Sequence, residues 1–305
     1  MSTFGSTLSN GNSLDAGKIE ALPDMKGKNV LITGVYGIGG ALAMLCLEKG
    51  AEKVIAVDRE QSSLDKLADH ANLVKVTADI GTKEGPKTIA AAAGNTPIHF
   101  VMLAAACPKN TAGMGTNLTS ISREDMEDMM NTDVYGKLFV CQAIGENLKS
   151  AEPKARVFNL GAPFSDGPKP DGTYMVVPGW AGFGAAKAAN KWIHEGMKAD
   201  MKDWALFGYG HPGMTKSLLT DEFATKYDKA HPMAAMVSKR WEASDYHTPE
   251  ETATVFYSIM TKTSDEDYQT GTWNVVRSYT TFGQELGVKE IADVKAGIAL
   301  PPPAK

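Results

Sequence analysis

Cysteine is scarce in this sequence, and long apolar runs are missing. The three cysteines, Cys46, Cys107 and Cys141, are scattered along 305 residues and form no C-x-x-C or Cys/His spacing. The sequence therefore predicts neither a zinc site nor a disulfide framework. Cysteines in apolar surroundings fit a reducing compartment, and we expect a cytoplasmic protein. No stretch of about 18 apolar residues occurs, so neither a membrane-spanning helix nor a membrane partner is expected.

Positive charge is not clustered either. The net charge is −5 at pH 7, the isoelectric point is about 5.7, and the chain contains no basic run. Nucleic acid and anionic membranes are therefore poor partners for this chain. A hydrophobic share of 43% and a charged share of 22% are ordinary for a globular protein, and the length suffices for a large core.

The most informative stretch is a glycine-rich turn between a strand and a helix. Residues 29–33 form a short apolar run, residues 41–47 follow a helical pattern, and Gly34, Gly37, Gly39 and Gly40 lie between them. A dinucleotide-binding loop requires this context, because glycine lets backbone approach a pyrophosphate while the helix N-terminus offers free N–H groups. The other interpretation is an ordinary strand-to-helix turn.

Short apolar strands alternate with helical patterns through the rest of the chain. Strands are predicted at 29–33, 54–57, 73–76, 99–105, 156–160, 205–208 and 272–276, with helices at 15–22, 41–47, 64–71, 83–92, 123–144, 183–200 and from 249 onward. This alternation predicts an α/β fold, a Rossmann-type doubly wound parallel sheet of about seven strands with helices on both faces. We expect a flexible extension over 1–25, a single domain over 26–298 and a tail over 299–305.

Several spaced motifs between residues 26 and 278 accompany this pattern. They are TGVYGIGG at 33–40, an acid at Asp58, Asp79-Ile80, AAAC at 104–107, NTDVYG at 131–136, and Pro212-Gly213 followed by Ser217. Together they resemble the landmarks of the short-chain dehydrogenase/reductase superfamily, although the glycine loop is one residue shorter than in its short-type members. The resemblance implies an oxidoreductase that binds NAD, with NADP possible. It implies these cofactor-binding residues: Gly34, Tyr36, Gly37, Ile38, Gly40, Asp58, Arg59, Asp79, Ile80, Ala104, Ala105, Lys187, Pro212, Gly213 and Ser217.

The residues themselves favour NAD over NADP. Asp58 follows a strand, where a carboxylate can accept both ribose hydroxyls and would repel a 2′-phosphate. Tyr36 in the glycine loop carries no positive charge, which points the same way. Arg59 directly follows Asp58 and is the alternative, a phosphate ligand; Asp58 and Asp79 can also be read as helix-capping acids.

The family's active site is matched at a single position. The resemblance places an Asn, a Ser, a Tyr and a Lys in that site, and here these positions hold Asp133, Gly161 or Ala162, Phe183 and Lys187. Phenylalanine has no ionisable proton, so the usual proton transfer at that atom is impossible. We expect Lys187 and Asp133 to belong to the site; the other interpretation of Lys187 is a surface lysine.

A long Pro- and Gly-rich loop over 163–182 precedes the helix that carries Lys187. Loops at the carboxyl ends of parallel strands lie where ligands bind. Asp166 and Tyr174 are therefore candidates for a replacement acid, or else solvated loop residues. The histidines, His211 beside Pro212 included, show no metal-ligand or triad pattern.

Two functions follow from these observations. The first is an NAD(P)-dependent oxidoreductase that reduces an imine, an iminium ion or a conjugated acceptor, none of which needs an acid on a substrate oxygen. The second is a non-redox cofactor-binding protein of the same fold, a cyclase, an isomerase or a pseudoenzyme. The expected partner is a small organic substrate, with no metal, and the resemblance implies a homodimer or homotetramer through the helices at 126–144 and 183–201.

Overall fold

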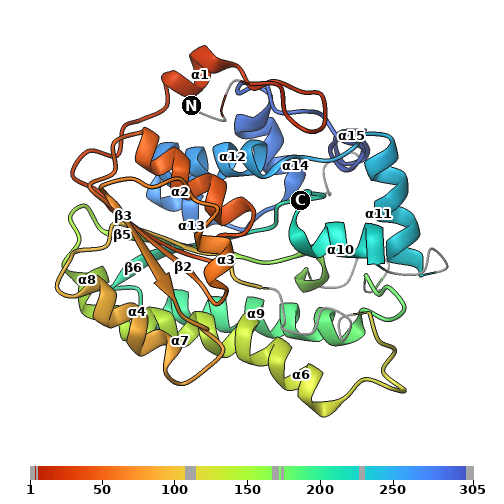
Figure 1. Ribbon diagram of the computed structural model, residues 1–305, viewed down its shortest axis with the longest axis horizontal. Coiled ribbons are helices and arrows are strands. Elements are labelled where there is room, and N and C mark those ends of the chain that lie inside the picture. Colours follow the sequence, from red (N-terminus) through yellow and green to blue (C-terminus); the bar gives the residue numbers. More distant parts are fainter. Residues whose placement is uncertain are drawn as a thin grey trace.

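A seven-stranded parallel sheet lies at the centre of the computed structural model, which describes residues 4, 6–106, 115–166, 172, 175–226 and 231–299 (Figure 1). The strand order is β3-β2-β1-β4-β5-β6-β7, and neighbouring strands pair in parallel throughout this sheet. The strands are β1 (Asn29–Thr33), β2 (Lys53–Asp58), β3 (Leu73–Thr77), β4 (Phe100–Leu103), β5 (Ala155–Leu160), β6 (Ala205–Gly210) and β7 (Thr272–Trp273). The predicted fold class is confirmed.

Helices cover both faces of the sheet (Figure 1). They are α1 (Ala16–Glu20), α2 (Ile38–Glu48), α3 (Gln61–Leu64), α4 (Gly85–Ala93), α6 (Arg123–Met130), α7 (Lys137–Ala143), α8 (Gly145–Lys149), α9 (Ala181–Asp200), α10 (Leu218–Lys226), α11 (Pro232–Glu242), α12 (Pro249–Lys262), α13 (Asp265–Gln269), α14 (Val275–Ser278) and α15 (Ala292–Ala299). None of the helices in the described part of the chain is long and apolar enough to cross a membrane.

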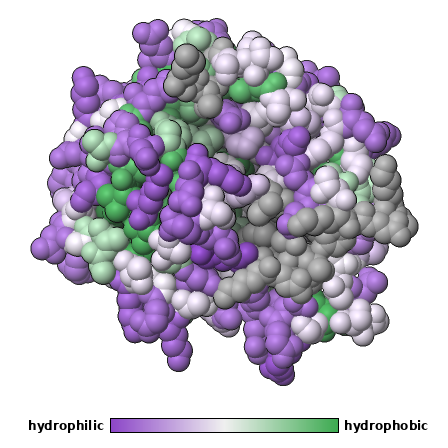
Figure 2. Space-filling view, viewed as in Figure 1, coloured by the Kyte–Doolittle hydropathy of each residue, from purple (hydrophilic) through white to green (hydrophobic). Residues whose placement is uncertain are grey.

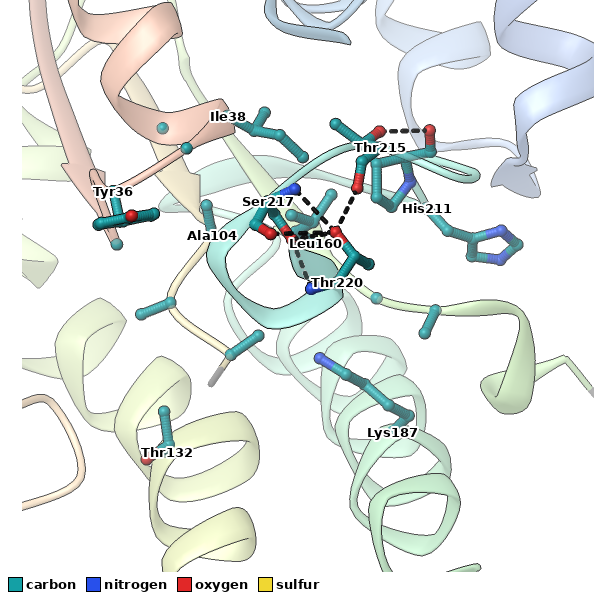
Figure 3. Close-up of a pocket in the computed structure, with 18 of the residues that line it drawn as sticks. Tyr36, Ile38, Ala104, Thr132, Leu160, Lys187, His211, Thr215, Ser217 and Thr220 are labelled. Carbon is teal, nitrogen blue, oxygen red and sulfur yellow. Dashed lines mark hydrogen bonds between the residues drawn. The ribbon is translucent and has the colours of Figure 1, made fainter. Parts of the chain in front are cut away.

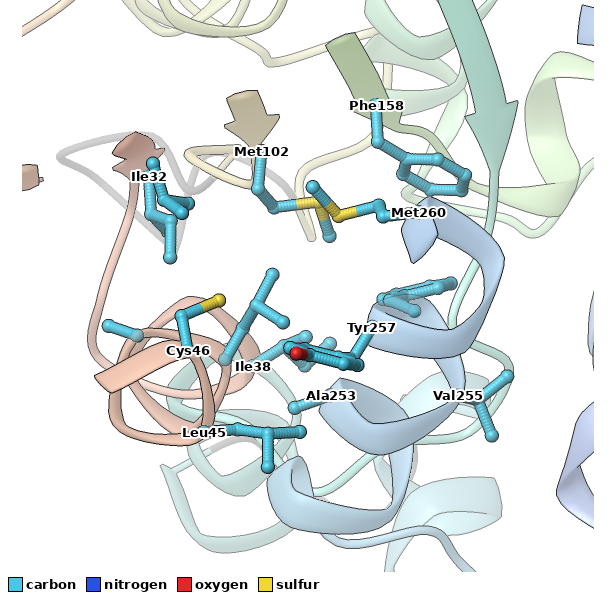
Figure 4. Close-up of a cluster of buried hydrophobic side chains, with 14 of the residues drawn as sticks. Ile32, Ile38, Leu45, Cys46, Met102, Phe158, Ala253, Val255, Tyr257 and Met260 are labelled. Carbon is cyan, nitrogen blue, oxygen red and sulfur yellow. The ribbon is translucent and has the colours of Figure 1, made fainter. Parts of the chain in front are cut away.

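Two hydrophobic cores sandwich the sheet because its strands are buried on both faces. On one face, Ile32, Met102 and Phe158 of β1, β4 and β5 point towards Cys46 of α2 and Tyr257 of α12 (Figure 4). The opposite face packs against α4, α7 and α9. Hydrophilic side chains cover most of the molecular face in Figure 2. The strand order reverses between β1 and β4, which opens a crevice at the carboxyl ends of these strands.

The helix predicted over 123–144 is interrupted by a π-helical turn at Asn131–Gly136. Ser122 caps its start by accepting from the N–H of Asp125. At Gly136 an added Cβ would lie 2.7 Å from the carbonyl oxygen of Ile80, so glycine permits the close approach of the helix to the loop after β3. π-turns inside helices are frequent at functional sites, and this turn carries Thr132 and Asp133.

Some predicted elements have wrong bounds. The helix predicted over 64–71 is misplaced, because the helix in this segment, α3, ends at Leu64, and the strand predicted over 99–105 covers only Phe100–Leu103. The last strand ends at Trp273, because the Asn274 side chain accepts from the N–H of Arg277 and caps α14 instead. A side-chain oxygen that satisfies a first-turn N–H favours a helix start over further strand.

Contrary to the expected flexible extension over 1–25, the described part of this segment, residues 4 and 6–25, packs on the domain. Phe4, Leu8 and Leu14 are buried in the core beside α2 and α12. Asn10 and Asn12 donate hydrogen bonds to the carboxylate of Glu251, which is 0% exposed. Burying a carboxylate costs free energy unless it is hydrogen-bonded. The polar residues Asn10 and Asn12 therefore supply hydrogen bonds that the buried Glu251 carboxylate requires. The proposed domain limits stay predictions, and residues 300–305 of the tail lie outside the described residues.

Candidate functional site

A pocket of about 670 Å³ lies at the carboxyl ends of the strands. The loops after β1, β2, β3, β4, β5 and β6 all contribute to its lining, as does α9. In Figure 3, Tyr36, Ala104 and Thr132 lie on the left of the pocket, Lys187 reaches in from α9 below, and His211 lies on the right. The topology therefore brings together residues that are far apart in the sequence.

The glycine turn forms one end of this pocket. Gly34 has φ +79°, and an added Cβ would lie 2.6 Å from the backbone of Ala105, so only glycine fits there. Gly37 precedes the first turn of α2, and no side chain of the described residues caps this helix. Gly37, Ile38 and Gly39 line the pocket, so the first-turn N–H groups and the positive end of the helix dipole are available to an anion.

An acid held by backbone groups lies beside the glycine turn. The Asp58 carboxylate accepts from the N–H of Val35 at 2.9 Å and from the N–H of Glu60 at 3.0 Å. These bonds fix the carboxylate at the end of β2, where it lines the pocket together with Arg59. The ammonium of Lys66 lies 3.9 Å from the ring centroid of Tyr36, so this end of the pocket carries cations as well as an acid.

Most of the predicted cofactor residues line this pocket. They are Gly34, Tyr36, Gly37, Ile38, Asp58, Arg59, Asp79, Ile80, Ala104, Ala105, Lys187, Pro212, Gly213 and Ser217. Gly40 is not among the lining residues and packs beneath the turn, where an added Cβ would lie 2.2 Å from the carbonyl oxygen of Val35. Of the other candidates, Asp133 and Asp166 are not among the lining residues, and Tyr174 lies outside the described residues.

Lys187 belongs to a buried trio of charged groups. Asp133 Oδ1 lies 2.7 Å from Lys187 Nζ and 3.2 Å from Lys137 Nζ, and Lys137 also donates to the carbonyl oxygen of Leu160 at 2.7 Å. The three charged side chains are at most 2% exposed. Burial lowers the pKa of Lys137 to about 7, against the opposing effect of Asp133. One carboxylate thus compensates the Lys187 ammonium and positions it in the pocket.

Aromatic and methionine side chains form the other half of the pocket. The rings of Phe164, Trp180 and Phe183 contact one another with centroids 5.1–5.9 Å apart, and Phe183 is 3% exposed. Met175, Val177, Met214, Met233 and Met236 also line this half. This half therefore suits an apolar, ring-containing molecule, because such surfaces are desolvated at little cost.

The residue after β5 leaves no space for a side chain. A Cβ on Gly161 would lie 1.9 Å from the hydroxyl oxygen of Tyr209. That hydroxyl donates to Ser165 Oγ at 2.9 Å, and Ser165 in turn donates to the carbonyl oxygen of Ala162 at 2.6 Å. Burial raises the pKa of Tyr209, so its phenol stays protonated. A serine at position 161 would require this packed network to rearrange.

His211 is a pocket residue to which no sequence pattern pointed. It follows β6, is 3% exposed, and lines the pocket. Its Nε2 lies 3.2 Å from Asp166 Oδ1. The only available signal was its place directly after a strand and before Pro212-Gly213, and that signal does not identify Asp166 as its partner.

Comparisons with known proteins identify relatives of this chain. A protein family described as short chain dehydrogenase matches residues 28–228. Gluconate 5-dehydrogenase of Gluconobacter oxydans is 27% identical over 220 residues, which are 67% of this chain and 79% of that enzyme.

Solved structures show the same fold. A short chain dehydrogenase/reductase from Saccharomyces cerevisiae superposes with a TM-score of 0.70 at 17% identity, covering 81% of this chain and 96% of that one. A short chain dehydrogenase from Burkholderia cenocepacia in complex with NADP superposes with a TM-score of 0.62 at 20% identity, covering 92% of this chain and 100% of that one. NADPH-bound carbonyl reductase from chicken fatty liver superposes with a TM-score of 0.64 at 20% identity, covering 83% of this chain and 97% of that one.

The buried trio yields a stability prediction. Asp133→Ala leaves two buried lysines without a counter-charge and should lower the free energy of unfolding by about 3–5 kcal/mol, measured by urea denaturation. Glu127→Ala is the control, because Glu127 pairs with Arg123 on the surface of α6 with 59% of its side chain exposed. The free energy of unfolding of Glu127→Ala should fall by less than about 1 kcal/mol. Equal losses in the two variants would show that Asp133 compensates no buried charge.

Proposed function

The chain belongs to the short-chain dehydrogenase family, and we propose that it is an NAD(P)-dependent oxidoreductase with a non-standard active site. The uncapped start of α2 beside the pocket supports nucleotide binding, because it offers N–H groups to a pyrophosphate. Asp58 would hold the adenosine ribose and Lys187 the nicotinamide ribose. The bound dinucleotide would supply hydride to an acceptor in the apolar half of the pocket. The NADP and NADPH in two of the solved structures support this assignment.

The observation that carries the proposed chemistry is the aromatic ring at position 183. If Phe183 stands where the family has its tyrosine, no phenol is available to protonate a substrate oxygen. The compensation of Lys187 by Asp133 is consistent with this, since no phenolate needs stabilising there. We therefore propose an acceptor of the imine, iminium or conjugated type. The faces of Phe164, Trp180 and Phe183 would attract a cationic acceptor.

The pocket argues against a sugar-acid substrate, although gluconate 5-dehydrogenase is similar over much of the chain. A polyhydroxylated carboxylate needs several hydrogen-bonding groups around it, because each hydroxyl that is buried without a partner costs binding energy. The substrate half is instead lined by Phe164, Trp180, Met214, Met233 and Met236. This lining supports a mid-sized organic molecule with an apolar ring system.

A cofactor preference follows from Asp58. NADH should bind more tightly than NADPH in a fluorescence titration, because the carboxylate would repel a 2′-phosphate. Lys187→Ala should weaken the binding of both nucleotides by about tenfold, because a hydrogen bond from a charged group is lost. Lys191→Ala is the control, since Lys191 lies one turn further along α9 and pairs with Glu195.

Two results would contradict this prediction. Tighter binding of NADPH would overturn the preference and make Arg59 or Lys66 the phosphate ligand. Absence of binding by either nucleotide would remove the oxidoreductase proposal and leave the non-redox alternative, in which the pocket acts as a template or a binding module.

The proposed chemistry is tested by NADH and NADPH consumption with matched acceptors. The unmodified protein should reduce cyclic iminium ions or enones and turn over simple ketones and secondary alcohols about 10²–10⁴ times more slowly than an enzyme with the phenol, because it lacks a general acid at position 183. Phe183→Tyr should retain nucleotide affinity and raise ketone reduction. Phe164→Tyr, which adds a phenol elsewhere in the same aromatic cluster, should not. Brisk oxidation of secondary alcohols by the unmodified protein would refute our assignment of Phe183.

We also propose a homodimer or homotetramer built on the outer helices. Tyr135 and Phe139, which follow α6, are 46% and 47% exposed, and Trp192 of the neighbouring helix α9 is 81% exposed. Large apolar side chains gathered on adjacent helices support a self-complementary interface.

Light scattering should therefore give a multiple of the 32.6 kDa chain mass at micromolar concentration. Trp192→Glu should shift the population to the monomer, because it places a charge in the apolar contact. A particle of 32.6 kDa for the unmodified protein would refute the assembly.

A further inference from the structure

We propose that His211, held by Asp166, is the proton donor of this pocket, and that the acceptor is a neutral imine protonated on nitrogen as it is reduced. This inference rests on the proposed function and deepens it. A permanently charged iminium ion would need no such residue, whereas a neutral imine requires a proton as well as hydride.

His211 lies beside the position where the resemblance places the family's serine. Leu160 of β5 pairs with Gly210 of β6, so Gly161 and His211 are the next residues along two adjacent parallel strands. The N–H of Gly161 donates to the carbonyl oxygen of Gly210 at 2.8 Å, which continues the pairing into the loops. The ring of His211 therefore lies at the same edge of the sheet as the proposed reaction centre, with Pro212 and Gly213 lining the pocket beside it.

Asp166 orients the His211 ring. The carboxylate contacts Nε2 at 3.2 Å, and within the described part of the chain no group hydrogen-bonds to Nδ1. Since His211 also lines the pocket, Nδ1 is the ring nitrogen that is left for a substrate. The Asp166 side chain is 47% exposed, so the pair links the pocket to solvent, from which a spent proton can be replaced.

Three other proton donors among the described residues of this region, Tyr209, Ser165 and Lys187, are already engaged. The Tyr209 hydroxyl donates to Ser165, and Ser165 donates to the carbonyl oxygen of Ala162. The Lys187 ammonium is paired with Asp133. Asp166 itself does not line the pocket, so it acts on the substrate only through His211. We therefore assign His211 the catalytic role and Asp166 the positioning role.

With the reduced nucleotide as the hydride donor and solvent as the final source of the proton, the step needs no further reactant. Protonated His211 gives its Nδ1 proton to the imine nitrogen, and a new N–H bond forms. The C=N π pair becomes the nitrogen lone pair that takes this proton, while hydride completes the C–H bond at the neighbouring carbon. The products are a secondary amine, the oxidised nucleotide and a neutral imidazole that retains the proton on Nε2 towards Asp166. The ring then takes up a proton from solvent.

The test compares an acceptor that needs a proton with one that does not. The probes are a weakly basic cyclic imine that is uncharged near neutral pH, 2,3,3-trimethylindolenine, and its N-methyl iminium salt. His211→Gln should lower turnover of the neutral imine by about 10²–10⁴ and lower turnover of the iminium salt far less. Asp166→Asn should lower imine turnover less than His211→Gln does, and it too should affect the imine more than the iminium salt. His70→Gln, the same change at an exposed site, is the matched control.

A binding measurement complements the kinetics without turnover. Calorimetry should show that His211→Ala weakens binding of a cyclic amine of the product type, 1,2,3,4-tetrahydroisoquinoline, by about tenfold, because a hydrogen bond to a charged amine is lost. The same variant should bind NADH as the unmodified protein does.

The possible outcomes separate the two proposals. Equal turnover of the neutral imine by His211→Gln and the unmodified protein would overturn the role of His211 and leave the proposed function standing. Equal losses with both probes would also overturn it, because His211 would then shape the pocket rather than donate a proton. If the unmodified protein reduces neither probe, the proposed redox function fails, and the inference fails with it.

Discussion

The carboxylate of Asp133 is the contact on which the architecture of the pocket depends. It joins Lys137 at the start of α7 to Lys187 of α9, and Lys137 in turn contacts the end of β5 through the carbonyl oxygen of Leu160. Because these groups are buried, loss of the Asp133 carboxylate would leave two lysines without a counter-charge in the interior. Asp133 lies in the π-helical turn at Asn131–Gly136. The irregular part of this helix is therefore the part that brings the carboxylate to the two lysines.

The pocket divides into a polar end and an apolar end, and the division follows from the strand order. The reversal between β1 and β4 opens the crevice, with the glycine turn and Asp58 on one side. On the other side, the loop after β5 and the residues after β6 bring in Phe164, Trp180 and His211. A dinucleotide is an extended molecule with a charged centre, and a pocket built in this way suits it at one end and an apolar substrate at the other.

The proposed chemistry and the packing of the substrate half support each other. Phe183 lies among other aromatic rings, and Tyr209 occupies the space that a side chain at position 161 would need. A serine at position 161 would therefore require packed residues around it to move, because cores tolerate little added volume. The apolar surroundings also exclude water, which strengthens any interaction between a polar substrate atom and His211.

The sequence by itself determined the fold class and the glycine turn at one end of the pocket. Alternating strand and helix patterns, and the glycines clustered between residues 34 and 40, are local features, so they can be read without knowing which segments meet. Only the tertiary structure decided the partners of Glu251, Asp133 and His211. Asn10 meets Glu251 across 241 positions, Asp133 meets Lys187 across 54, and Asp166 meets His211 across 45. No local pattern encodes such contacts, because the order of strands in the sheet, rather than their order along the chain, brings these side chains together.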